Sequence, residues 1–161
     1  MAQAIPTIEE LCGELMGIVS SVAAFKDNSY SIFSIDDFEN TVTDDRVPLP
    51  AAGVGYDGAR PINKDGTAAD GSNSVSMGEI QFLVIVAIQY QHAGQDDTKP
   101  AATNLLDQIR QKVLGYRGVN SRPWRWISEG PEPNASGDGL AFYSQVWRTT
   151  VPVKGVFNNQ Q

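Results

Sequence analysis

Apolar residues near the start of the chain recur at three- and four-residue steps, which predicts a helix over about 7–20. Thr7 and Glu10 have the spacing of a capping box, in which each side chain accepts a hydrogen bond from the backbone amide of the other residue. Cys12 falls within the apolar stripe, so we interpret it as a core residue. The stripe consists of Ile8, Leu11, Cys12, Leu15, Met16 and Val19.

The clearest strand pattern covers residues 80–90. Alternate positions from Ile80 onward form one fully apolar face, and the positions from Gln81 onward form a face that is apolar only in its middle. This pattern suits a central strand that is covered on both sides, at least partly. A second long strand is predicted over 140–151, where Pro152 marks its end or a sheet edge.

A second helix is predicted between these two strands. It begins near Pro100, a suitable first-turn residue, and it ends at Gly115, a natural terminator. Its apolar stripe consists of Ala102, Leu105, Leu106, Ile109, Val113 and Leu114.

Residues 27–78 carry weaker patterns. Short strands are predicted over 30–35 and 51–56, and the acidic stretch 36–45 has room for a helical turn. Residues 57–78 are predicted to form a long polar loop. A loop of this length is unusual inside a compact domain, so it is either functional or mobile.

The order of these elements predicts a single α/β (α+β) domain over residues 1–161. We expect a mixed sheet of four or five strands, with helices packed mainly on one face. The two strong strands are separated by a helix, which fits either a βαβ crossover or an antiparallel pair joined through the long loop.

Composition excludes several classes of protein. The chain has 161 residues, 41% of them hydrophobic, which excludes an intrinsically disordered chain, and its one cysteine excludes a disulfide scaffold. No apolar run reaches the roughly 20 residues that span a bilayer, and the N-terminus lacks the pattern of a signal peptide. We therefore expect a soluble protein made in a reducing cytoplasm, with no membrane partner. A pI near 4.6 argues against a dedicated nucleic-acid binder.

Charge is distributed unevenly along the chain. Residues 1–90 carry 13 acidic and 4 basic side chains, whereas residues 91–161 carry 6 acidic and 8 basic ones, for a total charge of −7. Two interpretations remain open: a solvated basic face, or a basic surface that meets an acidic surface of a neighbouring copy or another partner. The basic residues between Asp107 and Glu129 are Arg110, Lys112, Arg117, Arg122 and Arg125.

Tryptophan and arginine alternate in residues 122–127, which we predict to be a loop. The tryptophans could anchor this loop to the domain or form an oligomer interface, where Trp and Arg are enriched. Aromatic and basic residues together also form platforms for single-stranded nucleic acid, although the acidic net charge opposes that interpretation. The candidate residues for a subunit or partner interface are Arg117, Arg122, Trp124, Arg125 and Trp126.

Candidate catalytic chemistry is sparse. Residues Gly53–Gly58 match the G-x-G-x-x-G pattern of dinucleotide-binding turns, but the required helix does not follow them, so a glycine-bearing strand and turn is the favoured interpretation. His92, the only histidine, has no nucleophile elbow near it in sequence. The acidic pairs lack EF-hand spacing. We expect no enzyme, cofactor or metal site; the alternative from another class is a small nucleotide-binding enzyme that uses Gly53–Gly58.

The order of elements resembles that of the tail terminator (tail completion) proteins of long-tailed phages, especially the Mu-like group. The resemblance covers most of the chain, apart from residues 60–78 and 122–126. The matching segments are the N-terminal amphipathic helix, Pro50–Gly58, Phe82–Tyr90, Asn104–Gly115 and Trp147–Val151.

This resemblance implies a structural role without catalytic residues. Tail terminators form a homohexameric ring on the last ring of the tail tube, stop its polymerisation and present a surface to the neck or connector of the head. The implied partners are further copies of this chain, the tail tube protein and the neck/connector protein. DNA would pass through the lumen without sequence-specific binding, and the implied location is the head-proximal end of the virion tail. A head–tail joining (neck) protein is the close alternative.

Overall fold

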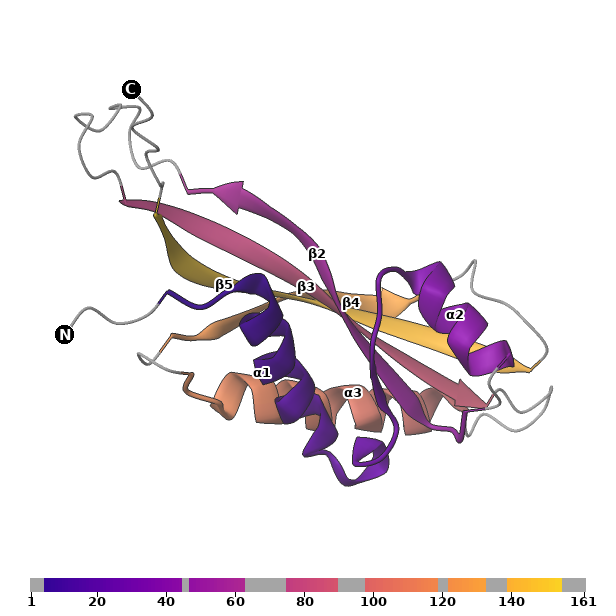
Figure 1. Cartoon of the computed structure of the whole chain (residues 1–161). Helices are drawn as coiled ribbons and strands as arrows, with labels where there is room; N and C mark the ends of the chain where they lie inside the picture. The colour runs from indigo at the N-terminus through magenta and orange to yellow at the C-terminus, as the bar shows by residue number, and fades with distance from the viewer. Residues whose placement is uncertain are drawn as a thin grey trace.

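A five-stranded mixed sheet with helices on both faces forms the domain (Figure 1). The computed structural model describes residues 5–44, 47–62, 75–89, 98–118, 122–132 and 139–154. The strands are β1 (Ser29–Ser31), β2 (Ala51–Pro61), β3 (Val75–Gln89), β4 (Trp124–Pro131) and β5 (Leu140–Lys154). The helices are α1 (Ile8–Ser20), the short 3-10 helix η1 (Ala23–Phe25), α2 (Ile35–Asp44) and α3 (Thr98–Gly115).

The strands lie in the order β1-β2-β3-β5-β4. β1 pairs with β2 in parallel, and all other neighbours are antiparallel, which makes the sheet mixed as predicted. The two strong strands of the sequence, β3 and β5, are adjacent and antiparallel from Val75↔Lys154 to Gln89↔Leu140. The antiparallel arrangement, one of the two left open by the sequence, is therefore the observed one.

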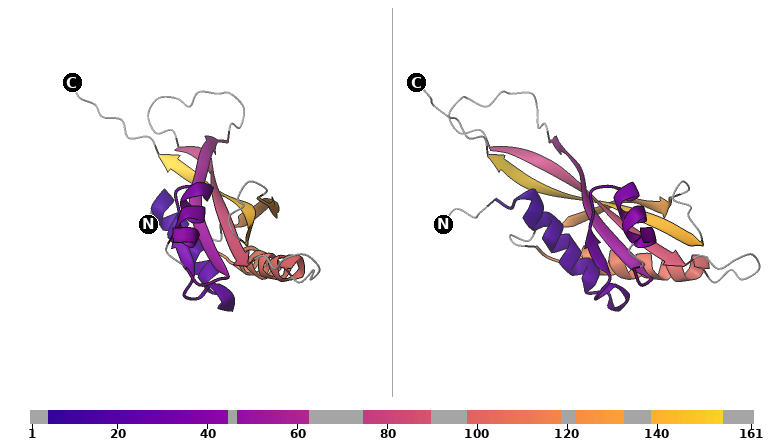
Figure 2. Two further views of the ribbon diagram at one scale, coloured as in Figure 1. Left: turned by 90° about the vertical axis from the view of Figure 1, so that its right-hand side faces the viewer. Right: turned by 45° about the vertical axis from the view of Figure 1, so that its right-hand side comes forward.

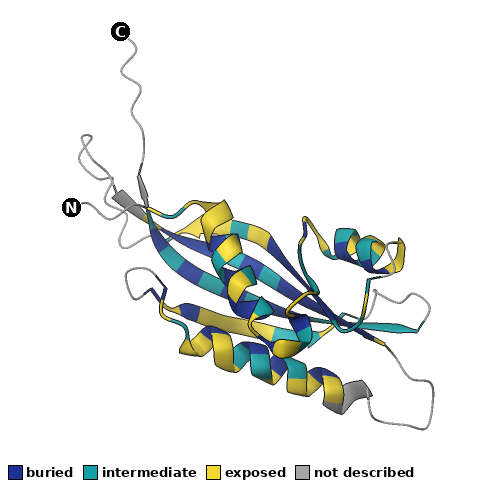
Figure 3. Ribbon diagram, turned by 60° about the horizontal axis from the view of Figure 1, so that its bottom comes forward, coloured by how far each residue is buried: buried dark blue, intermediate teal, exposed yellow. Residues whose placement is uncertain are grey.

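Helices α1 and α3 cover one face of the sheet, and α2 covers part of the other (Figure 2). Even-numbered residues of β3, such as Phe82 and Val84, are buried against Leu15 of α1 and Ile109 of α3. On the opposite face, Ile85 packs with Phe38 of α2. The centre of the sheet is covered on both faces, since the consecutive residues Val84–Ile88 of β3 are all buried (burial is coloured in Figure 3). The prediction of a central strand covered on both sides is confirmed.

The helix boundaries follow from local capping. In α1 the predicted capping box is present: the Glu10 amide donates to the Thr7 hydroxyl at 3.1 Å, and the Thr7 amide donates to the Glu10 carboxylate at 2.7 Å. The acidic stretch forms a ten-residue helix, α2, rather than a single turn. Two hydrogen bonds stabilise its start: the Asp37 amide donates to the Ser34 hydroxyl, and the Phe33 amide donates to the Asp37 carboxylate.

Two segments differ from their predictions. Residues 122–127 are not a loop, because β4 begins at Trp124 and pairs with β5. An irregularity between Trp126 and Ser128 interrupts the alternation of side chains, which hides the strand in the sequence. The predicted loop 57–78 is wrong at both ends, because its first residues belong to β2 and its last ones to β3. Residues 63–74 and His92 lie outside the described residues.

The glycines of the G-x-G-x-x-G pattern serve packing in β2. A Cβ atom at Gly53 would lie 2.9 Å from side-chain atoms of Ile32 and Phe38, and one at Gly55 would lie 2.6 Å from the backbone oxygen of Ile32. Gly58 has a φ of 126° beside an irregularity in the β2–β3 pairing, a conformation that favours glycine. The pattern therefore lies within a paired strand, without the turn and helix that hold a pyrophosphate.

We expect Gly55→Ala to lower the free energy of unfolding by about 1–3 kcal/mol, because the added methyl group displaces backbone rather than a flexible side chain. Gly130→Ala is the matched control in β4, where no atom of the described residues beyond the adjacent backbone lies within 4 Å of the new methyl group. Urea denaturation of both variants measures the difference. Equal stability of Gly55→Ala and the wild type would show that β2 does not require glycine here.

Candidate functional site

The five residues predicted to form an interface separate into a buried pair and an exposed group. Arg122 and Trp124 are 9% and 2% exposed, so they lie inside the fold. Arg117, Arg125 and Trp126 lie on the surface. The structure thus does not bring the five together on one outer surface.

The buried pair shares one carboxylate. Both oxygens of Glu14 lie 3.2 Å from Nη2 of Arg122, and Oε1 accepts the Trp124 indole N–H at 2.9 Å. The Trp124 ring also packs edge-on against Phe82, with 5.6 Å between centroids. The charge of Arg122 thus pairs within the chain and joins α1 to the start of β4, while a contact of Arg122 or Arg125 with a neighbouring copy stays a prediction. This pairing was invisible in the sequence because the partners lie about 110 residues apart.

We expect Glu14→Ala to destabilise the fold by about 3 kcal/mol, since it leaves the buried Arg122 guanidinium without its counter-ion. The double variant Glu14→Leu/Arg122→Met removes both charges, so it should lower the free energy of unfolding by less than Glu14→Ala does. Thermal and urea unfolding of the three proteins make the comparison. A double variant that is less stable than Glu14→Ala would contradict an origin in the unpaired charge.

Arg125 belongs to a second cluster, centred on Glu79 in the face of the sheet opposite α1 and α3. The Glu79 carboxylate is 4% exposed and accepts hydrogen bonds from Arg60 of β2, at 2.6 Å, and from Arg125 of β4. Nη1 of Arg148 on β5 lies 3.7 Å from the same carboxylate. Four adjacent strands thus contribute one buried carboxylate and three partly exposed guanidinium groups, and the cluster carries a net positive charge.

The pKa of Glu79 follows from this arrangement. Desolvation raises it, but the hydrogen bond from Arg60 and the charges of Arg60, Arg125 and Arg148 outweigh the desolvation. The pKa of Glu79 in the folded protein is therefore below its ordinary value of 4.5. A carboxylate whose pKa falls on folding contributes stability above its ordinary pKa and loses it as the pH falls toward the folded pKa.

We expect Glu79→Gln to flatten the acid limb of the stability profile. The wild type should lose free energy of unfolding more steeply than the variant between about pH 5 and pH 3, because only the wild type must protonate this carboxylate. Denaturant titrations across that range provide the slopes, and Glu9→Gln at an exposed position of α1 is the control for loss of one charge. Parallel slopes for wild type and Glu79→Gln would contradict the assignment.

Trp126 is held from the other side, by α3. The Arg110 guanidinium lies 4.8 Å from the centroid of the Trp126 ring, and it pairs with Glu129 of β4 at 2.5 Å. Gln145 of β5 joins the same network by donating to Glu129 at 2.8 Å and to the Leu106 carbonyl at 2.9 Å. Polar contacts thus position α3 against β4 and fix the orientation of the exposed tryptophan.

β4 forms one edge of the sheet, so one side of its backbone faces away from the other strands. Trp126 and Ile127 on this strand are 44% and 40% exposed, and the Arg125 side chain is 54% exposed. An edge strand with exposed apolar side chains is a template for pairing with another chain. The geometry of this surface therefore suits protein association. The sequence pattern indicated Arg125 and Trp126 as interface candidates but not the strand edge that carries them, because residues 122–127 were expected to form a loop.

Groups suited to catalysis are few among the described residues. No cluster of three or more His, Cys, Asp or Glu that could hold a metal ion occurs within them. Cys12 packs against the core as predicted, and burial raises the pKa of its thiol. None of the helices in the described part of the chain is long and apolar enough to cross a membrane.

No protein-family model and no curated protein matches this chain. Among solved structures, a chain from the virion of a native gene transfer agent particle is similar over 88% of this chain and 92% of that chain, with 12% sequence identity and a TM-score of 0.44. A likeness at this level identifies neither a family nor a function.

Proposed function

We propose that this protein is a structural component of a phage-type virion, a ring-forming tail terminator that caps the tail tube, stops its polymerisation and joins the tail to the neck or connector. The order of elements along the chain supports this proposal, since it resembles that of tail terminators. The observation that carries the proposal is the exposed β4 edge with Trp126 and Ile127, because a ring requires a surface that binds another copy.

A closed ring of identical chains uses two different surfaces of each copy, and the rotation between neighbours must close. β4 offers the first surface, with backbone groups for strand pairing and apolar side chains to bury. The exposed Arg125 side chain on the same strand offers a charged contact that speeds the association of two copies. Its pairing with Glu79 leaves more than half of its side chain exposed, which is compatible with a second partner.

The proposed ring acts by position rather than by chemistry. It has the tail tube protein on one side and the neck/connector protein on the other, and DNA passes through its lumen without sequence-specific contacts. The proposed location is the head-proximal end of the virion tail. The catalytic alternative loses its main support, because Gly53–Gly58 lie within β2 and the tight packing around Gly53 and Gly55 accounts for these glycines.

Reconstitution with purified tail tubes tests this function. We expect the protein to bind one end of each tube, to prevent further addition of tube subunits and to appear there as a ring by cryo-electron microscopy. Mass photometry measures its oligomeric state in solution. A protein that remains monomeric and neither binds tubes nor limits their length would refute the proposal. Density against the portal-side adaptor instead of the tube end would identify a neck protein.

We expect Ile127→Lys to weaken assembly by at least tenfold in apparent dissociation constant, because it places a charge in the apolar contact of an edge strand. Ile127→Val keeps an apolar β-branched side chain and should assemble almost as the wild type does. Both variants are compared with the wild type by mass photometry and by tube capping. If Ile127→Lys assembles normally, β4 is not the contact between copies.

A further inference from the structure

Phe33 presents an aromatic ring to solvent in the segment that joins β1 to α2. Its side chain is 92% exposed, whereas the preceding Ile32 is 6% exposed and hydrogen-bonds through its amide to Val54 of β2 at 3.0 Å. The Phe33 amide donates to the Asp37 carboxylate at 2.9 Å. The backbone on both sides of the ring is therefore anchored, which holds an apolar side chain outward.

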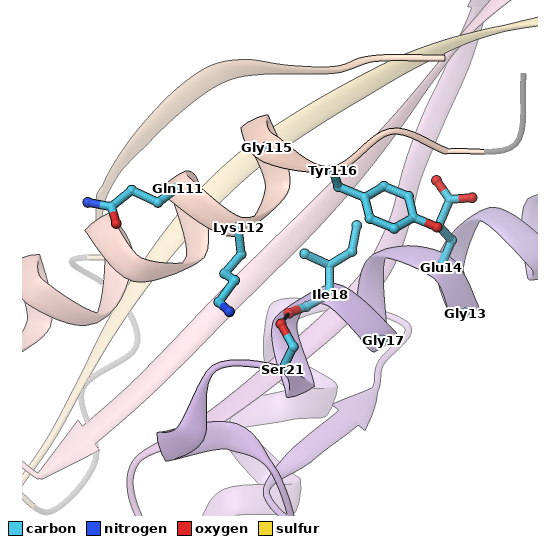
Figure 4. Close-up of a pocket in the computed structure, with 9 residues that line it drawn as sticks. All are labelled: Gly13, Glu14, Gly17, Ile18, Ser21, Gln111, Lys112, Gly115 and Tyr116. Carbon is cyan, nitrogen blue, oxygen red and sulfur yellow. Dashed lines mark hydrogen bonds between the residues drawn. The ribbon is translucent and has the colours of Figure 1, made fainter. Parts of the chain in front are cut away.

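A groove between α1 and α3 is the complementary feature (Figure 4). It has a volume of about 600 Å³, and the buried Ile18 forms part of its wall. Gly13 and Gly17 of α1 and Gly115 of α3 border it. Apart from the local helix backbone, no atom of the described residues lies within 4 Å of a Cβ placed on any of the three. Glycine inside a helix is unfavourable, and packing within the described chain does not require it at Gly13 or Gly17.

The charges around Phe33 and around the groove are of opposite sign. Helix α2, which begins two residues after Phe33, contains four acidic residues and no basic one. Lys112 borders the groove, and Arg117 follows shortly after α3. The one acidic residue in the groove wall, Glu14, is already paired with Arg122. An acidic surface that carries an exposed aromatic side chain is thus complementary to an apolar groove bordered by Lys112. The acidic residues of α2 are Asp36, Asp37, Glu39 and Asp44.

Phe33 cannot occupy the groove of its own chain. Phe33 lines the same hollow as Leu83 and the first residues of α2. Helix α2 packs on the face of the sheet opposite α1 and α3 (Figure 2). A contact between the two features therefore joins different copies. Each copy carries Phe33 on one face and the groove on the other, so the contact joins two different surfaces. Such a heterologous contact is what a closed oligomeric ring requires.

We propose that Phe33 of one copy inserts between α1 and α3 of the next copy. The phenyl group of Phe33 packs against Ile18 of the next copy, in the space left by Gly13, Gly17 and Gly115. The acidic residues of α2 in the first copy then face Lys112 and Arg117 of the next copy. This inference deepens the proposed function, since it rests on the association of identical chains and names the contact that orders them head to tail.

Cross-linking between two tagged variants tests the geometry. In a Cys12→Ala background, one chain carries Asp36→Cys and the other carries Gln111→Cys, so that Phe33 and the floor of the groove stay intact. A short bismaleimide should join the two chains into a covalent dimer that contains one of each. Thr43→Cys, an exposed position at the far end of α2, replaces Asp36→Cys as the control and should give no such dimer.

Substitutions test the energetics of the same contact. Phe33→Ala and Gly17→Leu should each raise the dissociation constant between copies by at least tenfold, measured by mass photometry. Met77→Ala, which removes another exposed apolar side chain, and Ser20→Leu, which enlarges a neighbouring position of α1 outside the groove, should change it by less than about threefold. The circular dichroism melting curves of all four variants should show that the fold is intact, because Phe33 is exposed and Gly17 borders open space.

The outcomes separate this contact from the proposed function. The specific covalent dimer together with weakened assembly of Phe33→Ala and Gly17→Leu supports the contact. Rings that form normally with both substitutions, or that give no cross-link between Asp36→Cys and Gln111→Cys, overturn the contact and leave the tail terminator proposal intact. A chain that stays monomeric alone and on tail tubes overturns both.

Discussion

The long antiparallel pairing of β3 with β5 determines where everything else in the domain lies. Each strand is 15 residues long, and together they form the centre of the sheet, with β2 on one side and β4 on the other. The register places Phe82 opposite Trp147 on the face covered by α1 and α3, and Ile85 opposite Ser144 on the other face. A shift of one residue would exchange the two faces and expose both cores.

Ion pairs within the chain account for part of the uneven charge distribution. The acidic first part and the basic second part of the sequence meet inside one chain: Glu14 of α1 pairs with Arg122, and Glu79 of β3 pairs with Arg125 and Arg148. Part of the charge asymmetry along the sequence is therefore accounted for by ion pairs within the folded chain. Within the described residues, the acidic side chains of α2 form no ion pair, and Lys112 and Arg117 lie near the C-terminal end of α3.

Dense apolar periodicity allowed the sequence to predict α1, α3 and the central strand, because burial on a defined face leaves a regular pattern. β4 left no such pattern, since it lies at an edge and its alternation is interrupted after Trp126. Helix α2 was underestimated because only Phe38 and Val42 are buried in it. The placement of Arg122 and Trp124 was not predictable, since their common partner Glu14 lies more than 100 residues away in sequence and no local signal links them.

The two edges of the sheet differ in a way that bears on assembly. β1 has only three residues, so it offers little backbone for pairing, whereas β4 has eight residues and an exposed apolar pair. Continuation of the sheet through both edges would thus give a short and weak contact at β1. A groove on the helical face avoids this restriction, because side-chain insertion does not depend on strand length. The proposed insertion of Phe33, just beyond the short edge strand, therefore adds a contact between copies to the one that β4 offers.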